Sequence, residues 1–309
     1  MIKIIDQLSN DLNYPIIKYY LSNPLILLKN RFTILLLKLK KIIGKDINFS
    51  SGVKSNIPID VVMCAIDKDY DVLVHVIDSI RKYIKHPICN IYLICPISER
   101  ISKIAKDKKC ILIDENKVLP ITKKNIIYTV NGQNRSGWLF QQLLKWSADK
   151  FVTNEYFLIT EADTAYCRPQ VFIHNHKVLI PVSNQFCHLP YFAAIKRLIG
   201  KKVDPIINLT SHHSLFEKTK LKALKHTIEK KCKVVWWQGI INKIDHKQGA
   251  SVSDYETYGQ FVYLNYPDDF EKEFWYNHSF KRSQLKDIKN IIRQSRNKYK
   301  NISFHSYDE

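Results

Sequence analysis

Two carboxylates directly follow a strongly apolar run in the middle of the chain. The run Tyr156–Thr160 is aromatic and β-branched, which predicts a buried strand, and Glu161 and Asp163 come next, one residue apart. In extended backbone, residues i and i+2 point to the same side, so both carboxylates can face one cleft at the strand's end. Such carboxylates are suitable ligands for Mg²⁺ or Mn²⁺, and phosphate oxygens would fill the other coordination positions of the ion. The alternative is a pair of solvated carboxylates at a strand end.

A second acidic stretch, SVSDYETYG, lies at residues 251–259. Ser253 followed by Glu256 fits a capping box, in which Ser253 is the N-cap of a helix and Glu256 bonds back to the N–H of Ser253. Asp254 is then left in the first helical turn, where the helix dipole keeps a carboxylate ionised near neutral pH. An ionised carboxylate at the mouth of a sheet suits a general base that takes a proton from a hydroxyl. Alternatively, Asp254 only complements the dipole.

The elements that must position these carboxylates are predicted from apolar patterns. Residues 59–65, 91–95 and 110–113 are apolar strands, and residues 72–83 have helical spacing of apolar side chains. Strand, helix and strand at these lengths indicate a right-handed parallel βαβ unit, and open α/β sheets bind ligands at the carboxyl ends of their strands. Neither a GxGxxG fingerprint nor a P-loop follows the first strand. Phosphate must therefore be bound by a metal and side chains.

A predicted helix at residues 135–146, RSGWLFQQLLKW, comes just before the central strand. Leucines supply its core face, and its polar residues are Arg135, Gln141, Gln142 and Lys145. Taken alone, these four polar residues are typical of a solvated helix face.

Three motifs in this order resemble a family of bacterial glycosyltransferases of the GT-A type, known mainly as a domain of unknown function. They are R-x-G-W-x-x-Q-Q-x-x-K from Arg135, an apolar strand ending in (D/E)-A-D-T with R-P after it, and S-(D/E)-Y-E-x-Y-G from Ser253. The resemblance runs from about residue 59 to the C-terminus and leaves the first 55 residues unexplained. We therefore predict a GT-A-like, Rossmann-like α/β domain over residues 56–309, with a doubly wound and mostly parallel sheet.

The resemblance implies transfer of a sugar from a nucleotide-sugar donor to a hydroxyl of a glycan or lipid-linked glycan, as in the assembly of lipopolysaccharide or capsule. Asp163 would hold Mn²⁺ or Mg²⁺, with help from Glu161, which stands where the family usually has Asp. A late histidine would complete the metal shell, and the candidates are His305 and, second, His278.

The same resemblance assigns the remaining roles. Asp254 would be the base of a direct displacement with inversion, and Glu256, in the same motif, is the second candidate catalytic residue. Of the adjacent pair His212 and His213, only one can face a site, and we choose His213. The residues expected to bind the donor are Ala65, Asp67, Arg135, Trp138, Gln141, Gln142, Lys145, Ala162 and His213.

Composition limits the choice of partners and compartment. The chain of 309 residues can bury one α/β core and still carry an appendage. Its net charge of +19 partly reflects a general excess of Lys, Ile and Asn, and the rest favours an anionic partner. The seven cysteines include no CxxC and no zinc spacing, which indicates reduced core thiols in a cytoplasmic protein without a signal peptide.

Residues 1–55 form a predicted basic amphipathic helical appendage, with a polar, turn-rich linker at residues 44–56. The apolar residues at 25–43 are interrupted by lysines and an arginine, so they fall short of the roughly 20 apolar residues of a spanning helix. Two interpretations stay open. The helix lies on an anionic membrane, which would place the protein at the inner face of the cytoplasmic membrane, or it packs on the core.

Two rival functions remain. A nucleotidyltransferase would use a similar sheet and metal carboxylates, but it usually needs a glycine-rich, basic phosphate loop after the first strand, and none follows Ala65. A non-enzymatic nucleic-acid or membrane binder would explain the charge but gives no role to Glu161, Asp163 and Asp254. The chain has no recognisable nucleic-acid module, so we expect no nucleic-acid partner.

Overall fold

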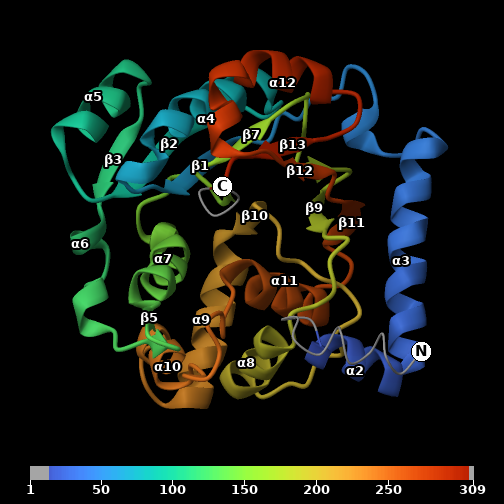
Figure 1. The fold of residues 1–309 in the computed structure, drawn as a ribbon, viewed down its shortest axis with the longest axis vertical. Helices are drawn as coiled ribbons and strands as arrows, with labels where there is room; N and C mark the ends of the chain where they lie inside the picture. The colour runs from blue at the N-terminus through green and yellow to red at the C-terminus, as the bar shows by residue number, and fades with distance from the viewer. Residues whose placement is uncertain (1–13, 306–309) are drawn as a thin grey trace.

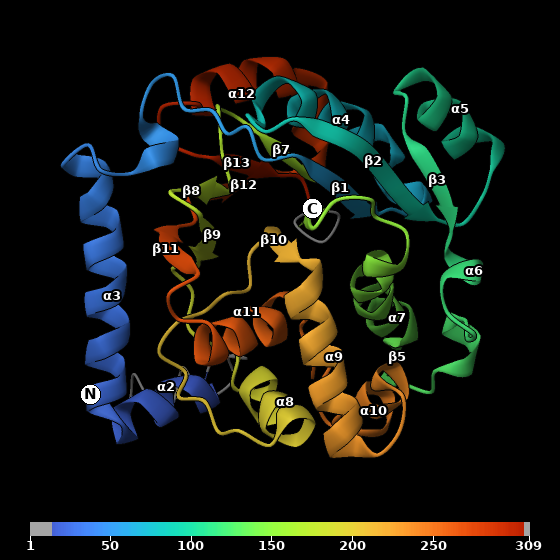
Figure 2. The same ribbon diagram turned by 180° about the vertical axis from the view of Figure 1, so that it is seen from behind.

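A five-stranded sheet forms the centre of the molecule in the computed structural model, which describes residues 14–305 (Figures 1 and 2). Its strand order is β10-β6-β1-β2-β3, with every neighbouring pair parallel except β10 and β6. The α/β class and the mostly parallel sheet are therefore confirmed. The strands of this sheet are β1 (Ile59–Cys64), β2 (Ile88–Cys95), β3 (Ile111–Asp114), β6 (Tyr156–Thr160) and β10 (His213–Glu217).

The register between β1 and β6 is supported by a buried acid that the sequence patterns did not reveal. Asp60 lies on β1 and is fully buried. Its Oδ2 accepts hydrogen bonds from the backbone N–H groups of Thr153, at 2.7 Å, and Asn154, at 2.9 Å. A buried carboxylate is tolerated when donors satisfy it, so Asp60 joins β1 to the loop that leads into β6. The carboxyl ends of the two strands consequently lie side by side.

Helices cover both faces of the sheet, as a doubly wound fold requires (Figures 1 and 2). On one side lies α4 (Tyr70–Tyr83), whose apolar positions at spacings of three and four are buried. On the other side lies α7 (Ser136–Trp146), which packs against β1. The remaining helices from the βαβ region onward are α5 (Glu99–Asp107), α6 (Glu115–Val118), α8 (Leu189–Ile199), α9 (Lys218–Cys232), α10 (Trp236–Asn242), α11 (Asp254–Asn265) and α12 (Ile288–Ser295).

The other strands of the described chain form two three-stranded sheets and a short hairpin. The apolar run at residues 178–182 lies in β9, which pairs with β8 and β11 and not with the central sheet. The last strand, β13, pairs antiparallel with β7, which directly follows the Glu161–Asp163 turn. The C-terminal chain thereby returns to the end of β6. These strands are β4 (Thr129–Val130), β5 (Gln133–Asn134), β7 (Thr164–Tyr166), β8 (Ile173–His174), β9 (Lys177–Val182), β11 (Phe270–Phe274), β12 (Asn277–Ser279) and β13 (Asn301–Ser303).

The described part of the N-terminal appendage contains the α-helices α2 (Tyr14–Ser22) and α3 (Pro24–Ile42); residues 1–13 of the predicted segment lie outside the described residues. One face of α3 packs on the core through Ile34 and Leu37, and Asn30 donates a hydrogen bond to the carbonyl of Ile206 at 2.7 Å. Figures 1 and 2 show α3 along one side of the molecule, beyond β11. The packing interpretation therefore holds for one face of this helix.

The predicted linker at residues 44–56 is tied to the core by a buried charge cluster. The ammonium group of Lys300 lies 3.1 Å from Oδ1 of Asp46 and 2.6 Å from Oε2 of Glu273. Asn48 donates a hydrogen bond to the same Glu273 oxygen at 2.9 Å. Burial raises the pKa of Glu273, whereas Lys300 lowers it. The lysine therefore holds two buried carboxylates from distant parts of the chain.

Removing this lysine should destabilise the whole protein. Lys300→Met leaves Asp46 and Glu273 buried without their counter-charge, and breaking a buried ion pair in this way typically costs about 3–5 kcal/mol of unfolding free energy. The matched control is Arg100→Ala, which removes the solvent-exposed pair with Asp71 and should cost less than about 1 kcal/mol. Urea denaturation of the two variants and the wild type measures the difference. Equal, small losses would contradict the role assigned to Lys300.

Candidate active site

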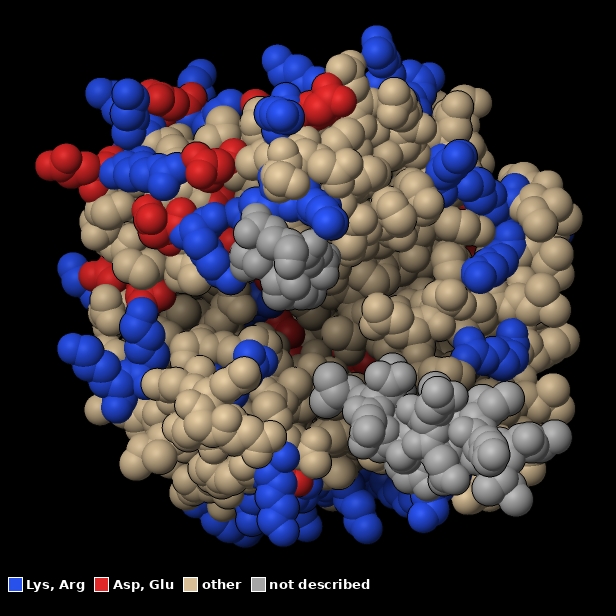
Figure 3. All heavy atoms as spheres, viewed as in Figure 1, with Lys and Arg blue, Asp and Glu red and all other residues tan. Residues whose placement is uncertain are grey.

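A pocket of about 620 Å³ opens where β1 and β6 end. Figure 3 shows a hollow near the middle of the face in view, with acidic atoms inside it. Most of the site residues predicted from the sequence line this one pocket. Those that line it are Ala65, Arg135, Trp138, Gln141, Gln142, Lys145, Glu161, Ala162, Asp163, Asp254 and His305.

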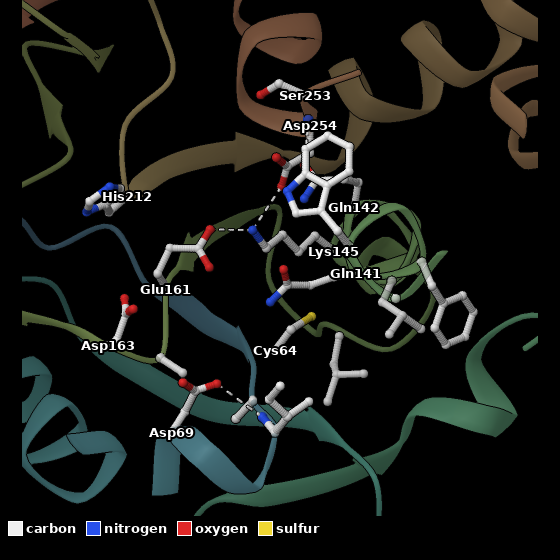
Figure 4. Close-up of a pocket in the computed structure, with 18 of the residues that line it drawn as sticks. Cys64, Asp69, Gln141, Gln142, Lys145, Glu161, Asp163, His212, Ser253 and Asp254 are labelled. Atoms are coloured by element: carbon white, nitrogen blue, oxygen red, sulfur yellow. Dashed lines mark hydrogen bonds and ion pairs between the residues drawn. The ribbon is translucent and has the colours of Figure 1, made fainter. Parts of the chain in front are cut away.

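Lys145 joins the two acidic motifs in this pocket. Its side chain is 1% exposed, and its ammonium group is bonded to Oε1 of Glu161 and lies 3.4 Å from Oδ2 of Asp254. Figure 4 shows Lys145 between these two carboxylates, with Gln141 directed into the same cavity. Burial alone would lower the pKa of Lys145, but Asp254 and Glu161 raise it above its ordinary value. The lysine is therefore a fixed positive charge, neutralised by protein carboxylates.

Three side chains on successive turns of α7 position Asp254. Gln142 accepts a hydrogen bond from the backbone N–H of Asp254 at 3.1 Å, and the indole N–H of Trp146 donates to the Asp254 carbonyl at 3.4 Å. Lys145 supplies the third contact, to the carboxylate itself. Residues 142, 145 and 146 share one helix face because they are three and four apart. Gln142 and Lys145, predicted as donor-binding residues, thus contact the first residue of α11.

The Asp254 carboxylate is perturbed by this environment. Burial raises its pKa to about 6, although Lys145 acts in the opposite direction. Its Oδ2 is buried and, apart from the ion pair with Lys145, makes no hydrogen bond to any described residue. We expected the helix dipole to keep this carboxylate ionised near neutral pH; burial acts against that effect, because the side chain is only 2% exposed. A carboxylate with a pKa near 6 is ionised at neutral pH and is a stronger base than an ordinary aspartate.

The capping box is confirmed only in part. The Ser253 hydroxyl accepts a hydrogen bond from the Glu256 N–H at 3.2 Å, so Ser253 is the N-cap of α11. The Glu256 side chain does not return to Ser253. It is fully buried, it does not line the pocket, and it accepts hydrogen bonds from Leu209 N–H, Thr210 Oγ1 and Gln260 Nε2. Its position gives Glu256 a role in holding the residue 209–210 loop, and not contact with a substrate.

Asp163 and His305 form a second polar pair, on the other side of Glu161. Oδ2 of Asp163 lies 2.9 Å from Nδ1 of His305, and the ring of His212 packs edge-on against that of His305. Burial would raise the pKa of Asp163, but the hydrogen bond and charge of His305 lower it. Phe304 N–H donates to the Asp163 carbonyl at 2.9 Å, because β13 pairs with β7. This pairing brings the predicted late histidine to the predicted metal carboxylate.

The side chains of Asp163 and His305 could bind a metal ion whose remaining coordination positions are filled by a bound phosphate ligand and water. Among residues 14–305, no group of three or more His, Cys, Asp or Glu side chains is arranged to hold a metal ion. Asp163 and His305 supply a carboxylate oxygen and an imidazole nitrogen side by side. Glu161 is engaged instead by Lys145 and by the Tyr255 hydroxyl, which donates to it at 2.9 Å. A cation that takes one or two protein ligands and completes its shell with phosphate and water matches this set.

Besides Glu256, three predicted residues lie outside the pocket. The ring of His213, the first residue of β10, is buried against Phe172 and Tyr166, whereas His212, directly before β10, lines the pocket. The choice of His213 over His212 is therefore wrong. Asp67 is exposed and pairs with Arg100.

His278, the second candidate for the metal shell, lies on β12 and stacks on Tyr299, away from the pocket.

The sequence reasoning missed several lining residues. Tyr255 lies within the S-(D/E)-Y-E-x-Y-G motif, which did not by itself indicate a role for it. Asp69 lies in an acidic turn after β1. Lys68 and Lys123 also line the pocket. Lysines on loops carry no spacing signal, so only the fold could bring them to the site.

Comparisons with solved structures found distant likenesses. Mouse xyloside xylosyltransferase 1, in its apo form, matches 82% of this chain and 99% of its own at 12% identity, with a TM-score of 0.47. The galactosyltransferase LgtC, in complex with donor and acceptor sugar analogues, matches 80% and 87% at 11% identity, with a TM-score of 0.41. The glycosyltransferase GlyE of Streptococcus pneumoniae TIGR4, in its apo form, matches 82% and 56% at 13% identity, with a TM-score of 0.39. At such identities the likeness concerns the fold alone.

No curated protein has significant sequence similarity to the chain. A family model described as a family of unknown function, DUF6492, matches residues 62–308, which contain the central sheet from β1 onward and every side chain of the pocket. The chain belongs to the DUF6492 family.

Proposed function

We propose that this protein is a metal-dependent glycosyltransferase that moves a sugar from a nucleoside-diphosphate sugar to a hydroxyl group of a glycan or lipid-linked glycan. Such an enzyme would work in the cytoplasm, at the inner face of the membrane, in surface-glycan assembly. One observation carries the proposal. A single pocket at the carboxyl ends of β1 and β6 holds a carboxylate with a pKa near 6 and, separately, a carboxylate–imidazole pair.

These two groups divide the work of a displacement reaction. Asp254 would accept the proton of the acceptor hydroxyl on its carboxylate, whose buried Oδ2 is paired with Lys145. The acceptor oxygen would then form a bond to the anomeric carbon as the bond from that carbon to the diphosphate oxygen breaks. The nucleoside diphosphate leaves with the electron pair, and one direct displacement gives inversion.

Asp163 and His305 would hold Mn²⁺ or Mg²⁺, with Glu161 contributing through its contacts to Lys145 and Tyr255 rather than as a direct ligand. When bound, such a cation neutralises charge on the departing diphosphate. Lys145 is already paired with two carboxylates, so it adds little attraction for phosphate.

The pocket offers other groups for the donor. Arg135 lies over the Trp138 ring, and its Nε donates to the Gly249 carbonyl at 2.7 Å, so its guanidinium is fixed at the pocket wall. Gln141 is directed into the cavity (Figure 4). Ala65 directly follows β1 and Ala162 lies two residues after β6. Their small side chains leave room beside the backbone for a ligand. We assign these residues to donor binding.

The metal assignment is tested by binding without turnover. Nucleoside diphosphates with Mn²⁺ should stabilise the wild-type protein by about 2.7 kcal/mol at 100 times the dissociation constant, which a thermal shift detects. Asp163→Ala should lose the Mn²⁺-dependent part of this shift. Asp67→Ala is the control, because it removes an exposed carboxylate outside the pocket and should keep the shift. Full Mn²⁺-dependent stabilisation of Asp163→Ala would exclude Asp163 as a metal ligand.

The base assignment predicts both a rate and a pH profile. Asp254→Asn should lower turnover by about 10²–10⁴, the usual contribution of a positioned general base. In the wild type, turnover should fall as pH drops through about 6, because burial has raised the pKa of Asp254 to about 6 and the protonated acid cannot accept a proton. Asp254→Asn should lack this acidic limb. A wild-type profile that is flat from pH 5 to pH 8, measured at saturating donor, would contradict the assignment.

Glu256→Gln is the contrasting substitution. All three groups bonded to Glu256 are donors, so an amide NH₂ would face one of them and leave it unsatisfied. We expect a loss of about 1–3 kcal/mol in unfolding free energy. Turnover well below the melting temperature should stay within a few-fold of wild type, because the side chain does not reach the pocket. If the folded variant were as inactive as Asp254→Asn, the two carboxylates would have been assigned the wrong way round.

A further inference from the structure

The outer face of α3 is apolar and exposed along its whole length. Leu28 is 65% exposed and Leu35 is 53% exposed, and their neighbours on this face follow at spacings of three and four residues. We call this face the outer stripe; it consists of Leu21 on α2 and of Leu25, Leu28, Phe32, Leu35, Leu36, Leu39, Ile42 and Ile43. Ile34 and Leu37, which pack on the core, lie on the opposite face. The helix therefore has two apolar faces, and only one of them is needed by the fold.

The charged residues of the segment that carries the outer stripe are all basic, although one of them, Lys40, is paired with Glu271 of β11. Residues 14–45 contain seven basic residues and no acidic one, the basic residues being Lys18, Lys29, Arg31, Lys38, Lys40, Lys41 and Lys45. On a helical projection at 100° per residue, Lys29 and Lys40 fall on one border of the stripe, and Arg31 and Lys38 fall on the other. Figure 3 shows mainly uncharged atoms along the side of the molecule over α3, with basic side chains next to it. The chain also carries a net charge of +19.

We propose that the outer stripe docks on the surface of an anionic lipid bilayer. An aliphatic face with lysine and arginine on both borders matches the boundary between acyl chains and anionic headgroups, where long basic side chains reach the phosphates. The helix would lie in the plane of the membrane: among residues 14–305, no helix is both long and apolar enough to cross a bilayer. This inference does not depend on the proposed sugar transfer.

A second copy of the chain fits the outer stripe less well. In a two-fold symmetric dimer the same patch faces itself, so basic borders would meet basic borders. Glu271 of β11 pairs with Lys40, but residues 14–45 contain no acidic side chain that could relieve the repulsion among Lys29, Arg31 and Lys38. Anionic lipid headgroups complement the same borders, and the charge pattern therefore selects a bilayer over a dimer.

Vesicle co-sedimentation of the full-length protein tests the proposal. We expect binding to vesicles of phosphatidylcholine with phosphatidylglycerol, and binding at least tenfold weaker to phosphatidylcholine alone or to the mixed vesicles in 0.5 M salt. Leu28→Ser with Leu35→Ser should weaken binding to the mixed vesicles by about a hundredfold, about tenfold for each leucine removed from an apolar environment. Both leucines are exposed, so the melting temperature should hardly change.

The matched control replaces two exposed isoleucines that lie outside the outer stripe. Ile97 is 52% exposed and Ile127 is 82% exposed, and neither belongs to α2 or α3. Ile97→Ser with Ile127→Ser should leave vesicle binding unchanged. Equal losses in the two double variants would overturn the proposal, as would wild-type binding that ignores lipid charge.

The size of the protein in solution, measured by light scattering after gel filtration, separates the remaining outcomes. We expect the same mass for the wild type and for Leu28→Ser with Leu35→Ser. A wild-type dimer that this variant converts to a monomer, without affinity for anionic vesicles, would make the outer stripe a subunit interface and overturn the proposal. A large fall in melting temperature of the variant would show that the stripe is packed, and that result also overturns it.

Discussion

The buried ammonium group of Lys145 is the interaction on which the arrangement of the pocket depends. It lies on α7 and contacts Glu161, directly after β6, and Asp254, the first residue of α11. Three elements that are distant in the sequence are thereby fixed to one point. Without the lysine, two carboxylates would be left in a largely buried site without a counter-charge, which is strongly unfavourable. The same ion pairs keep Asp254 ionised at neutral pH even though burial has raised its pKa to about 6.

The rest of the pocket is organised by strand pairing rather than by charge. Pairing of β13 with β7 brings the C-terminal end of the described chain next to the turn after β6, so that His305 meets Asp163. Glu161 and Asp163, the two carboxylates that follow β6, therefore contact different partners. Glu161 belongs to the Lys145 cluster, whereas Asp163 belongs to a pair that is suited to a cation shared with phosphate.

The positive charge of the chain has two distinct uses. Lys145 and Lys300 are almost fully buried, and each is neutralised by two carboxylates from different segments. They hold the fold together and contribute little to the field outside. The basic residues of α2 and α3 border an exposed apolar stripe, and their segment contains no acidic residue, although Lys40 is paired with Glu271 of β11. The second group, and not the net charge as such, indicates what the surface binds.

The sequence by itself determined the α/β class, the strands β1, β2 and β6, and eleven residues that line the pocket, because apolar periodicity and the residues at strand ends are local signals. It also determined Ser253 as an N-cap, a contact between residues three apart. Only the tertiary structure decided the bonding partners. Glu256 serves the Leu209–Thr210 backbone, His212 rather than His213 faces the pocket, and Lys145 binds carboxylates, because each of these contacts joins side chains more than ten residues apart or depends on which face of a strand meets the core.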